Sequence, residues 1–163
     1  MTAIVLADLN WGIAKDGKQI LTIKKDLMRF KQMTKEKTVI FGRKTLEQLP
    51  GGKPLPGRIN VCISQTLKNQ NISNLIVLDD ISSVNYRVSK DVFCIGGGQI
   101  YRHFYPQFDT IEVTRVLEDL DADLYFPPVD TDSSFERTNW SAKQYDAQSG
   151  AYYRFETYTR RRR

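Results

Sequence analysis

The chain of 163 residues has one histidine, His103, and two cysteines, Cys62 and Cys94. One histidine and two separated cysteines cannot supply the ligands of a typical zinc site, so we predict that no metal is bound. Both cysteines lie inside apolar runs, where we expect buried free thiols, as in proteins of a reducing cytoplasm. A single histidine without partners builds no catalytic triad, and His103 is interpreted as a surface residue of a helix.

Long apolar runs are also missing. None approaches the roughly 20 residues that cross a bilayer, and the first residues lack the basic-then-apolar order of a secretion signal. Hydrophobic residues make up 40% of the chain and charged residues 26%, as in ordinary globular proteins. We therefore expect a cytoplasmic protein with no membrane partner. The length and the even composition predict one domain, and we expect a monomer.

The net charge of +5 comes mostly from the last four residues, Arg160 to Arg163. Without them, 20 Lys and Arg residues face 19 Asp and Glu residues, so the body of the chain is nearly neutral. We interpret the run as a solvated, disordered tail, with contact to nucleic acid or a membrane as the alternative. No basic patch interleaved with aromatics occurs elsewhere, which argues against nucleic acid as a partner.

Strand-like and helix-like patterns alternate along the chain. Short apolar runs of the kind buried in parallel sheets occupy residues 3–7, 38–41, 59–64, 75–78 and 91–95. Helices are expected over residues 20–30, 45–49 and from residue 98, with loops at 10–19 and 50–57. Residues 110–116 and 153–158 alternate with period two and should pair antiparallel, with one face toward solvent. This order predicts an α/β domain: one open sheet with helices on both faces.

Three consecutive glycines, Gly96, Gly97 and Gly98, end one of the apolar runs and precede a helical pattern. Glycine has no side chain to bury, so its value here is the close approach of a ligand or another backbone. A helix that begins there directs N–H groups and its positive dipole end toward an anion such as a phosphate. A nucleotide-binding turn and a merely tight connection both remain open. Gly42 and Ser64 likewise follow strands, at the edge where such sheets bind ligands.

Two charged residues stand in unusual places. Asp26 is the only acid among residues 20–30, beside Ile23, Leu27 and Phe30, and an apolar setting should raise its pKa toward neutrality. The alternative is an exposed acid or N-cap in a first helical turn. Arg58 follows a Pro-Leu-Pro-Gly turn, and its guanidinium fork suits a carboxylate. The alternative is a solvated loop arginine.

These motifs occur in the order and approximate spacing of dihydrofolate reductases, which the chain resembles over residues 1–160. The resemblance rests on Asp26, Gly42-Arg43-Lys44-Thr45, residues 54–60 (PLPGRIN), residues 95–98, Thr114 and Phe126-Pro127. It implies a single three-layer α/β domain with a mostly parallel central sheet of about eight strands, an antiparallel C-terminal strand and about four flanking helices, followed by a basic tail at 161–163. It also implies an NADPH-dependent reduction of 7,8-dihydrofolate to tetrahydrofolate.

The resemblance implies a substrate pocket around Asp26. Asp26 would anchor the pterin and promote protonation of its N5, with Thr114 hydrogen-bonded to the carboxylate; simple β propensity is the other reading of Thr114. Arg58 would hold the α-carboxylate of the glutamate tail. The remaining substrate contacts would come from Ile4, Val5, Leu27, Phe30, Leu55 and Ile95. Ile20-Leu21 replaces the Pro-Trp usual in the family, so Leu21 occupies a catalytic position where a tryptophan ordinarily helps to order water. Antifolate inhibitors are implied as further ligands.

The resemblance places NADPH on the glycine turn. Arg43 and Lys44, beside Ser64 and Gln65, would meet its 2′-phosphate, which distinguishes it from NADH. Thr45, Gly97, Gly98, Gln99 and Ile100 would hold the pyrophosphate, although relatives often carry a basic residue in place of Gln99. The rest of the implied cofactor set is Leu6, Ile13, Ala14, Gly42, Gly96 and Tyr101. Ala14 replaces a common glycine in a mobile loop over the nicotinamide. The Gly96–Gly97 peptide bond is expected to be cis.

Two rival functions remain. A pyrimidine reductase of the riboflavin pathway shares the fold and the cofactor, but Asp26, Arg58 and Thr114 argue against it. The chain could instead be a binding module that uses its arginine run on RNA. Two measurements would separate these functions. A reductase gives a decay of absorbance at 340 nm with NADPH and dihydrofolate, whereas an RNA-binding module has an RNA affinity that is lost when residues 160–163 are removed.

Overall fold

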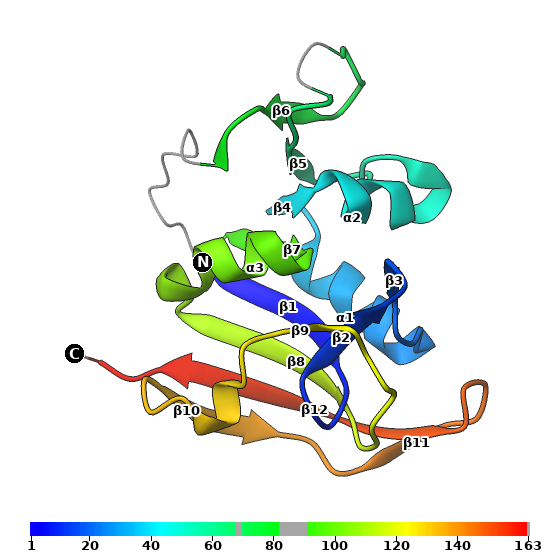
Figure 1. Cartoon of the computed structure of the whole chain (residues 1–163), viewed down its shortest axis with the longest axis vertical. Coiled ribbons are helices and arrows are strands. Elements are labelled where there is room, and N and C mark those ends of the chain that lie inside the picture. The colour runs from blue at the N-terminus through cyan, green and yellow to red at the C-terminus, as the bar shows by residue number, and fades with distance from the viewer. Residues whose placement is uncertain (68–69, 82–90, 163) are drawn as a thin grey trace.

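The computed structural model describes residues 1–67, 70–81 and 91–162. Its main sheet has the strand order β10-β12-β8-β1-β7-β4-β5-β6, with β11 paired to β12 (Figure 1). The strands are β1 Thr2–Ala7, β4 Thr38–Gly42, β5 Ile59–Ile63, β6 Ile76–Leu78, β7 Val92–Gly96, β8 Thr110–Val116, β10 Phe135–Trp140, β11 Gln144–Asp146 and β12 Ala151–Arg160. All pairings from β8 to β6 are parallel, while β12 pairs antiparallel with β8, β10 and β11.

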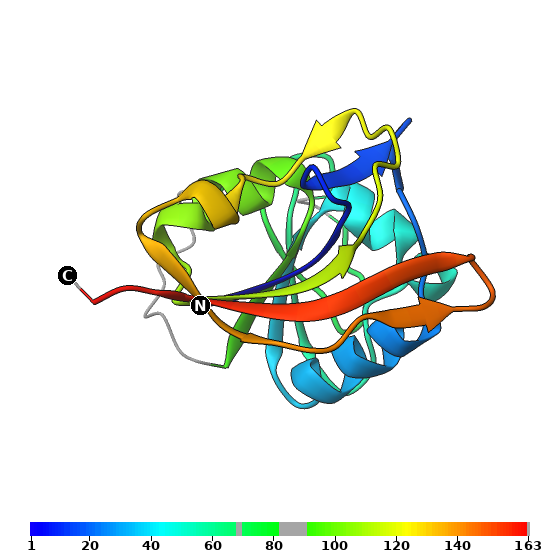
Figure 2. The same ribbon diagram turned by 90° about the horizontal axis from the view of Figure 1, so that it is seen from below.

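Helices cover both faces of this sheet. Helix α1 (Lys24–Thr34) lies on the opposite side from α3 (Gly98–Phe104), as the view in Figure 2 shows. The short α2 (Arg43–Gln48) packs Leu46 into the same apolar cluster as Phe30 of α1. Three α-helices occur within the described residues, together with 3-10 turns at Pro50–Gly52, Tyr105–Gln107 and Val129–Thr131. The expected three-layer α/β fold is confirmed.

The apolar runs form strands where the sequence predicts them, although Ile59 at the start of β5 and Ile76 of the edge strand β6 are exposed. All of β1 from Ala3 to Ala7 is buried, as are Val39, Ile40 and Phe41 of β4. The two period-two segments pair antiparallel, with Phe155 opposite Thr114. Cys62 and Cys94 are buried and unpaired, as expected. His103 is exposed on α3.

A second, three-stranded sheet was not predicted. The segment expected to be a plain loop, residues 10–19, contains β2 (Gly12–Lys15) and β3 (Lys18–Gln19), and β2 also pairs with β9 (Leu124–Tyr125). Asp16 and Gly17 join β2 to β3 with φ of 50° and 78°. Asp-Gly is a favoured pair for such a left-handed hairpin turn. The expectation of one sheet is therefore wrong for this segment, whose strands are too short to show a period.

The prediction of a solvated tail is wrong for Arg160, the first residue of the arginine run. Arg160 is the last residue of β12, and its guanidinium donates from Nε to the Phe108 carbonyl at 2.7 Å and from Nη2 to the Tyr105 carbonyl at 2.8 Å. The Arg161 backbone N–H donates to the Ser134 carbonyl at 2.8 Å. Arg163 lies outside the described residues. No helix in the described part of the chain is long and apolar enough to cross a membrane.

Candidate active site

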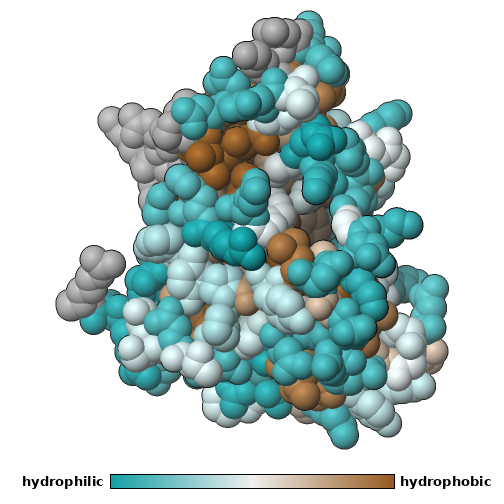
Figure 3. Space-filling view, viewed as in Figure 1, coloured by the Kyte–Doolittle hydropathy of each residue, from teal (hydrophilic) through white to brown (hydrophobic). Residues whose placement is uncertain are grey.

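The carboxyl ends of three neighbouring parallel strands meet at one edge of the main sheet. Gly42 of β4 pairs with Ile63 of β5, and Phe41 pairs with Gly96 of β7. The structure therefore brings Gly42, Ser64 and Gly96 together, as predicted from their positions after strands. In the space-filling view, apolar residues are visible in a recess between the β5, β6 and α2 part of the chain and the rest of the molecule (Figure 3).

The triple glycine makes the sharp turn from β7 into α3. The Gly96–Gly97 bond is cis, as expected, and Gly96 has a φ of +113°. A Cβ on Gly96 would lie 3.0 Å from the ring of Tyr101, and one on Gly97 would lie 3.7 Å from Thr45 Oγ1. A Cβ on Gly42 would lie 3.3 Å from Ile100. The starts of α2 and α3 thus approach each other across backbone that carries no side chains.

Polar groups border this turn. Arg43 Nη1 lies 2.5 Å from Glu47 Oε1 one helical turn away, and Lys44 is exposed. Ser64 is buried, with its hydroxyl 3.1 Å from Thr66 Oγ1, whereas Gln65 and Gln99 are exposed. Neither α2 nor α3, as described, has a side-chain N-cap hydrogen bond. Their first N–H groups are therefore left for solvent or for a ligand.

Asp26 lies buried in the first turn of α1, with 8% of its surface exposed. The hydroxyl of Thr114 on β8 donates to its Oδ1 at 2.6 Å, which confirms the expected pair. Burial raises the pKa of Asp26, and the opposing effects of the Thr114 hydrogen bond and the Arg29 charge do not cancel this rise. The N-cap of α1 is Ile23, so the alternative of an exposed or capping acid is wrong.

Apolar side chains flank Asp26 on the α1 face of the sheet. Ile4, Phe30, Leu55 and Ile95 belong to one cluster, and Leu6, Leu21 and Ile23 belong to the next, with Tyr153. Leu27 is half exposed. Val5 points to the opposite face of β1 and packs in the cluster of Trp11 and Phe104. The side chain of Val5 is therefore not brought to this pocket, since adjacent residues of a strand face opposite sides.

Arg58 sits at the end of the Pro-Leu-Pro-Gly turn and is 9% exposed. It donates from Nε to the Pro56 carbonyl at 3.0 Å and from Nη1 to Thr34 Oγ1 at 3.1 Å. Burial lowers the pKa of its guanidinium, which nevertheless stays charged because that pKa starts far above neutrality. Its Nη2 makes no hydrogen bond to the described residues. The alternative of a solvated loop arginine is wrong.

The small sheet reaches the glycine turn through Leu124, which pairs with Ala14 and would lie 3.0 Å from a Cβ on Gly98. Asp123 donates its N–H to the Ala14 carbonyl at 3.0 Å and accepts from the Asp16 N–H at 2.9 Å. At the hairpin tip, Gln48 of α2 donates from Nε2 to the Gly17 carbonyl at 2.8 Å. The hairpin is thus attached both to the loop after β8 and to α2.

Gly12 is the tightest point of this attachment, because a Cβ there would lie 2.4 Å from the Cβ of Ala122. Gly12→Ala is expected to cost about 1–3 kcal/mol of the free energy of unfolding, the usual price of overpacking. Urea unfolding measures the cost. Ala122→Gly in the same chain should recover part of it by making room; if the double variant is no more stable than Gly12→Ala, the clash with Ala122 is not the cause.

Sequence reasoning missed two roles. Tyr101, expected only beside the cofactor, donates its hydroxyl to the Ile4 carbonyl at 2.6 Å and so joins α3 to β1. Arg115 is buried on β8, on the same face as Ile111 and Val113. The alternation of residues 110–116 contained that signal, because it puts Arg115 on the inner face with two apolar residues.

Comparison with known proteins agrees with this geometry. The family model described as dihydrofolate reductase matches residues 1–160. Similar proteins include the dihydrofolate reductase of Haemophilus influenzae, 36% identical over 76% of this chain and 76% of its own length, and that of Schistosoma mansoni, 34% identical over 81% and 80%. The bifunctional dihydrofolate reductase-thymidylate synthase of Daucus carota is 35% identical over 96% of this chain, which spans about a third of that relative (33%). The chain belongs to the dihydrofolate reductase family.

Proposed function

We propose that the protein reduces 7,8-dihydrofolate to 5,6,7,8-tetrahydrofolate with NADPH, by hydride transfer to C6 and protonation of N5. Family membership supports dihydrofolate as the substrate. The single observation that carries the chemistry is the buried Asp26 carboxyl, bonded to Thr114 at 2.6 Å between two apolar clusters. We also propose that the protein acts as a monomer and that antifolates occupy the same pocket.

Asp26 is suited to hold the pterin and to retain a proton. An ionised carboxyl accepts hydrogen bonds from the pterin amino group and ring nitrogen, and a protonated one can supply a proton. A raised pKa keeps more of the acid protonated near neutrality, where a general acid works best. Thr114 fixes the orientation of the carboxyl by donating to Oδ1. Ile4, Phe30 and Ile95, which belong to one apolar cluster, would exclude water from the pterin ring.

The side chain of Leu21 has no hydrogen-bonding group at the position where the family usually has a tryptophan. It is partly buried against Ile23 and Tyr153, and its backbone carbonyl accepts from Gln19 Nε2 at 2.9 Å. Its side chain therefore shields the pocket and orients no water. Protonation of N5 then depends on Asp26, directly or through a water that Asp26 itself holds.

The residues at the glycine turn suit a dinucleotide. A Cβ on Gly42 would lie 3.3 Å from Ile100, so glycine there lets the starts of α2 and α3 come close, and their first N–H groups would bind the phosphates. Thr45, Gly98, Gln99 and Ile100 would hold the pyrophosphate, and Ser64, Gln65, Arg43 and Lys44 the 2′-phosphate. Leu6, Ile13, Ala14, Gly96 and Tyr101 would surround the nicotinamide. When bound, NADPH supplies the hydride.

The direct test is the decay of absorbance at 340 nm with purified protein, NADPH and dihydrofolate. Turnover is expected, and its absence with correctly folded protein would overturn the proposal. RNA binding through the arginine run is the weaker alternative, because the guanidinium of Arg160 is engaged with Tyr105 and Phe108 and that of Arg161 lies 3.4 Å from Glu136.

Arg43 and Lys44 are expected to determine preference for NADPH over NADH. Replacing both with alanine should raise the KM for NADPH about 10-fold or more, since each charge-assisted hydrogen bond contributes roughly 1.5–3 kcal/mol. The KM for NADH should change little, because NADH lacks the phosphate. A control with the same charge change, Lys35→Ala with Lys143→Ala, replaces two exposed cations elsewhere. Equal weakening of both cofactors by the Arg43 and Lys44 variant would show that these residues do not recognise the 2′-phosphate.

A further inference from the structure

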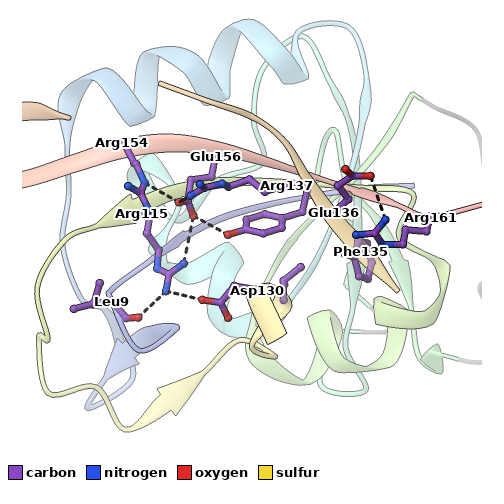
Figure 4. Close-up of a pocket in the computed structure, with 11 residues that line it drawn as sticks. Leu9, Arg115, Asp130, Phe135, Glu136, Arg137, Arg154, Glu156 and Arg161 are labelled. Carbon is purple, nitrogen blue, oxygen red and sulfur yellow. Dashed lines mark hydrogen bonds and ion pairs between the residues drawn. The ribbon is translucent and has the colours of Figure 1, made fainter. Parts of the chain in front are cut away.

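Arg115 is a buried charged residue, and its side chain lies on the face of β8 opposite the Asp26 pocket. Only 5% of its surface is exposed. Its Nε donates to the Asp8 carbonyl at 2.8 Å and its Nη2 to the Leu9 carbonyl at 2.6 Å. The guanidinium also lies 4.1 Å from the ring centroid of Trp11. One side chain thus contacts residues 8, 9 and 11 of the segment that leaves β1. Figure 4 shows its bond to Leu9 and its ion pairs with Asp130 and Glu156.

The other partner of Arg115 is Glu156 of β12, which is almost fully buried. Arg115 Nη1 lies 3.3 Å from Glu156 Oε1, while Arg137 and Arg154 donate to Oε2 at 3.1 and 2.7 Å. Tyr158 adds its hydroxyl at 3.1 Å. These groups surround the floor of an open pocket of about 520 Å³. Glu156 therefore has two cations besides Arg115, and Arg115 is not needed merely to neutralise it.

The segment that Arg115 holds is also constrained by its own hydrogen bonds. Asp8 is fully buried, and its Oδ1 accepts from the N–H groups of Asn10 at 2.9 Å and Gly12 at 2.8 Å. Its Oδ2 accepts from the Leu120 N–H at 2.9 Å, in the loop after β8. Trp11 has a φ of 66°, a left-handed conformation that is costly for a bulky residue. Such a conformation persists where the surrounding structure imposes it.

The contacts of Arg115 help to impose this left-handed conformation on Trp11. Its two carbonyl bonds fix the peptide groups before Trp11, and its stacking fixes the indole from one face. At the other end, the indole Nε1 donates to Asp130 at 2.9 Å, and Asp130 lies 3.5 Å from Arg115 Nη2. Buried ion pairs add little to net stability, so a network of this kind is better explained by the geometry that it specifies. Ile13 and Ala14 come directly after the segment that this network holds.

We infer that Arg115 is a positioning residue for reduction: it fixes the turn at residues 8–12 and thereby sets where Ile13 and Ala14 meet the nicotinamide. The part played by Ile13 and Ala14 rests on the proposed function. Arg115 itself touches neither ligand, since it lies on the opposite face of β8 from the Asp26 pocket. Its effect passes through the backbone of five residues.

The test compares Arg115→Met with Arg154→Met. Both variants remove one arginine from Glu156, but the contacts of Arg154 in this cluster do not include residues 8–12. In the protein without cofactor, amide exchange at Trp11 and Gly12 should accelerate about 10-fold in Arg115→Met, because opening of the turn costs less. Hydride transfer in a single turnover with NADPH and dihydrofolate should slow about 10-fold or more, as expected when reacting groups are misplaced. Arg154→Met should change neither quantity more than about 2-fold.

Equal exchange at Trp11 and Gly12 in the two variants would overturn the inference, as would faster exchange with unchanged hydride transfer. If Arg115→Met does not fold, Arg115→Lys decides: it keeps a cation near Glu156 but lacks the planar fork, so exchange should still accelerate. Unchanged exchange in Arg115→Lys would then count against the role. Failure of the proposed function appears separately, as a wild-type protein that folds and does not oxidise NADPH with dihydrofolate.

Discussion

Asp26→Asn is expected to slow hydride transfer to dihydrofolate about 100-fold or more near pH 7, the usual contribution of a positioned acid-base group. Asparagine has nearly the shape of aspartate and can still accept the Thr114 hydroxyl through its carbonyl oxygen. The substitution therefore removes the titrating proton with little change in packing. Single-turnover absorbance at 340 nm measures the step without interference from product release.

The pH dependence gives the same variant a second readout. Burial raises the pKa of Asp26 above that of an ordinary carboxyl, so the wild-type rate should be level below this raised pKa and should fall as pH rises through it. Asp26→Asn has no such group, so its rate should not show this change of slope with pH. A wild-type-like rate at pH 7, or an unchanged pH profile in the variant, would contradict the assignment of Asp26 as the acid.

The stability of this variant should move in the opposite direction from its activity. A carboxyl whose pKa is higher in the folded state than in the unfolded state binds its proton more tightly when folded. Its ionisation therefore costs stability above the unfolded pKa, and the cost disappears at lower pH. Asp26→Asn should have a free energy of unfolding at pH 7 equal to or above that of the wild type. A loss of activity with gained stability cannot be attributed to misfolding.

Much of the site could be predicted because its signals are local. Asp26 is a lone acid in an apolar stretch, and Thr114 lies in a strand whose alternation shows its face. The triple glycine follows a buried run, and parallel strands place their carboxyl ends at one edge, which brings Gly42, Ser64 and Gly96 together. Placing these residues needed only a period, a break or an isolated charge within about ten residues, whereas their roles and the pairing of Thr114 with Asp26 came from the resemblance to dihydrofolate reductases.

The features that escaped prediction depend on partners distant in sequence. Strands β2 and β9 are too short to show alternation, and their pairing joins residues 12–14 to 124–125. Arg160 is held by carbonyls from residues 105 and 108, which nothing in a run of arginines indicates. Nothing in the local pattern indicates that Trp140 is 56% exposed, together with every other residue of β10 after Phe135. In each case the structure is decided by tertiary contacts, or by their absence among the described residues, and the local sequence pattern does not indicate them.

Arg58→Met is expected to raise the KM for dihydrofolate about 30-fold or more, because removing one partner of a hydrogen-bonded charge pair costs roughly 2–5 kcal/mol. The contacts of Arg58 in the structure support its proposed role in binding a carboxylate. Pro56 and Thr34 hold Nε and Nη1, so the guanidinium plane is fixed before substrate arrives, and Nη2 remains for the ligand. Arg58→Lys keeps the charge but loses the fork, and it should recover only part of the affinity.

The decisive control for Arg58 is the substrate rather than the protein. A dihydropterin that lacks the glutamate tail has no carboxylate, so Arg58→Met should reduce it with nearly the wild-type kcat/KM. Thr34→Val removes the 3.1 Å bond to Nη1 while leaving Nη2 in place. It should weaken dihydrofolate less than Arg58→Met does, because it loosens the guanidinium without removing it. If both variants and the wild type discriminate equally between the tailed and the tailless substrate, Arg58 supports the Pro-Leu-Pro-Gly turn and does not bind the carboxylate.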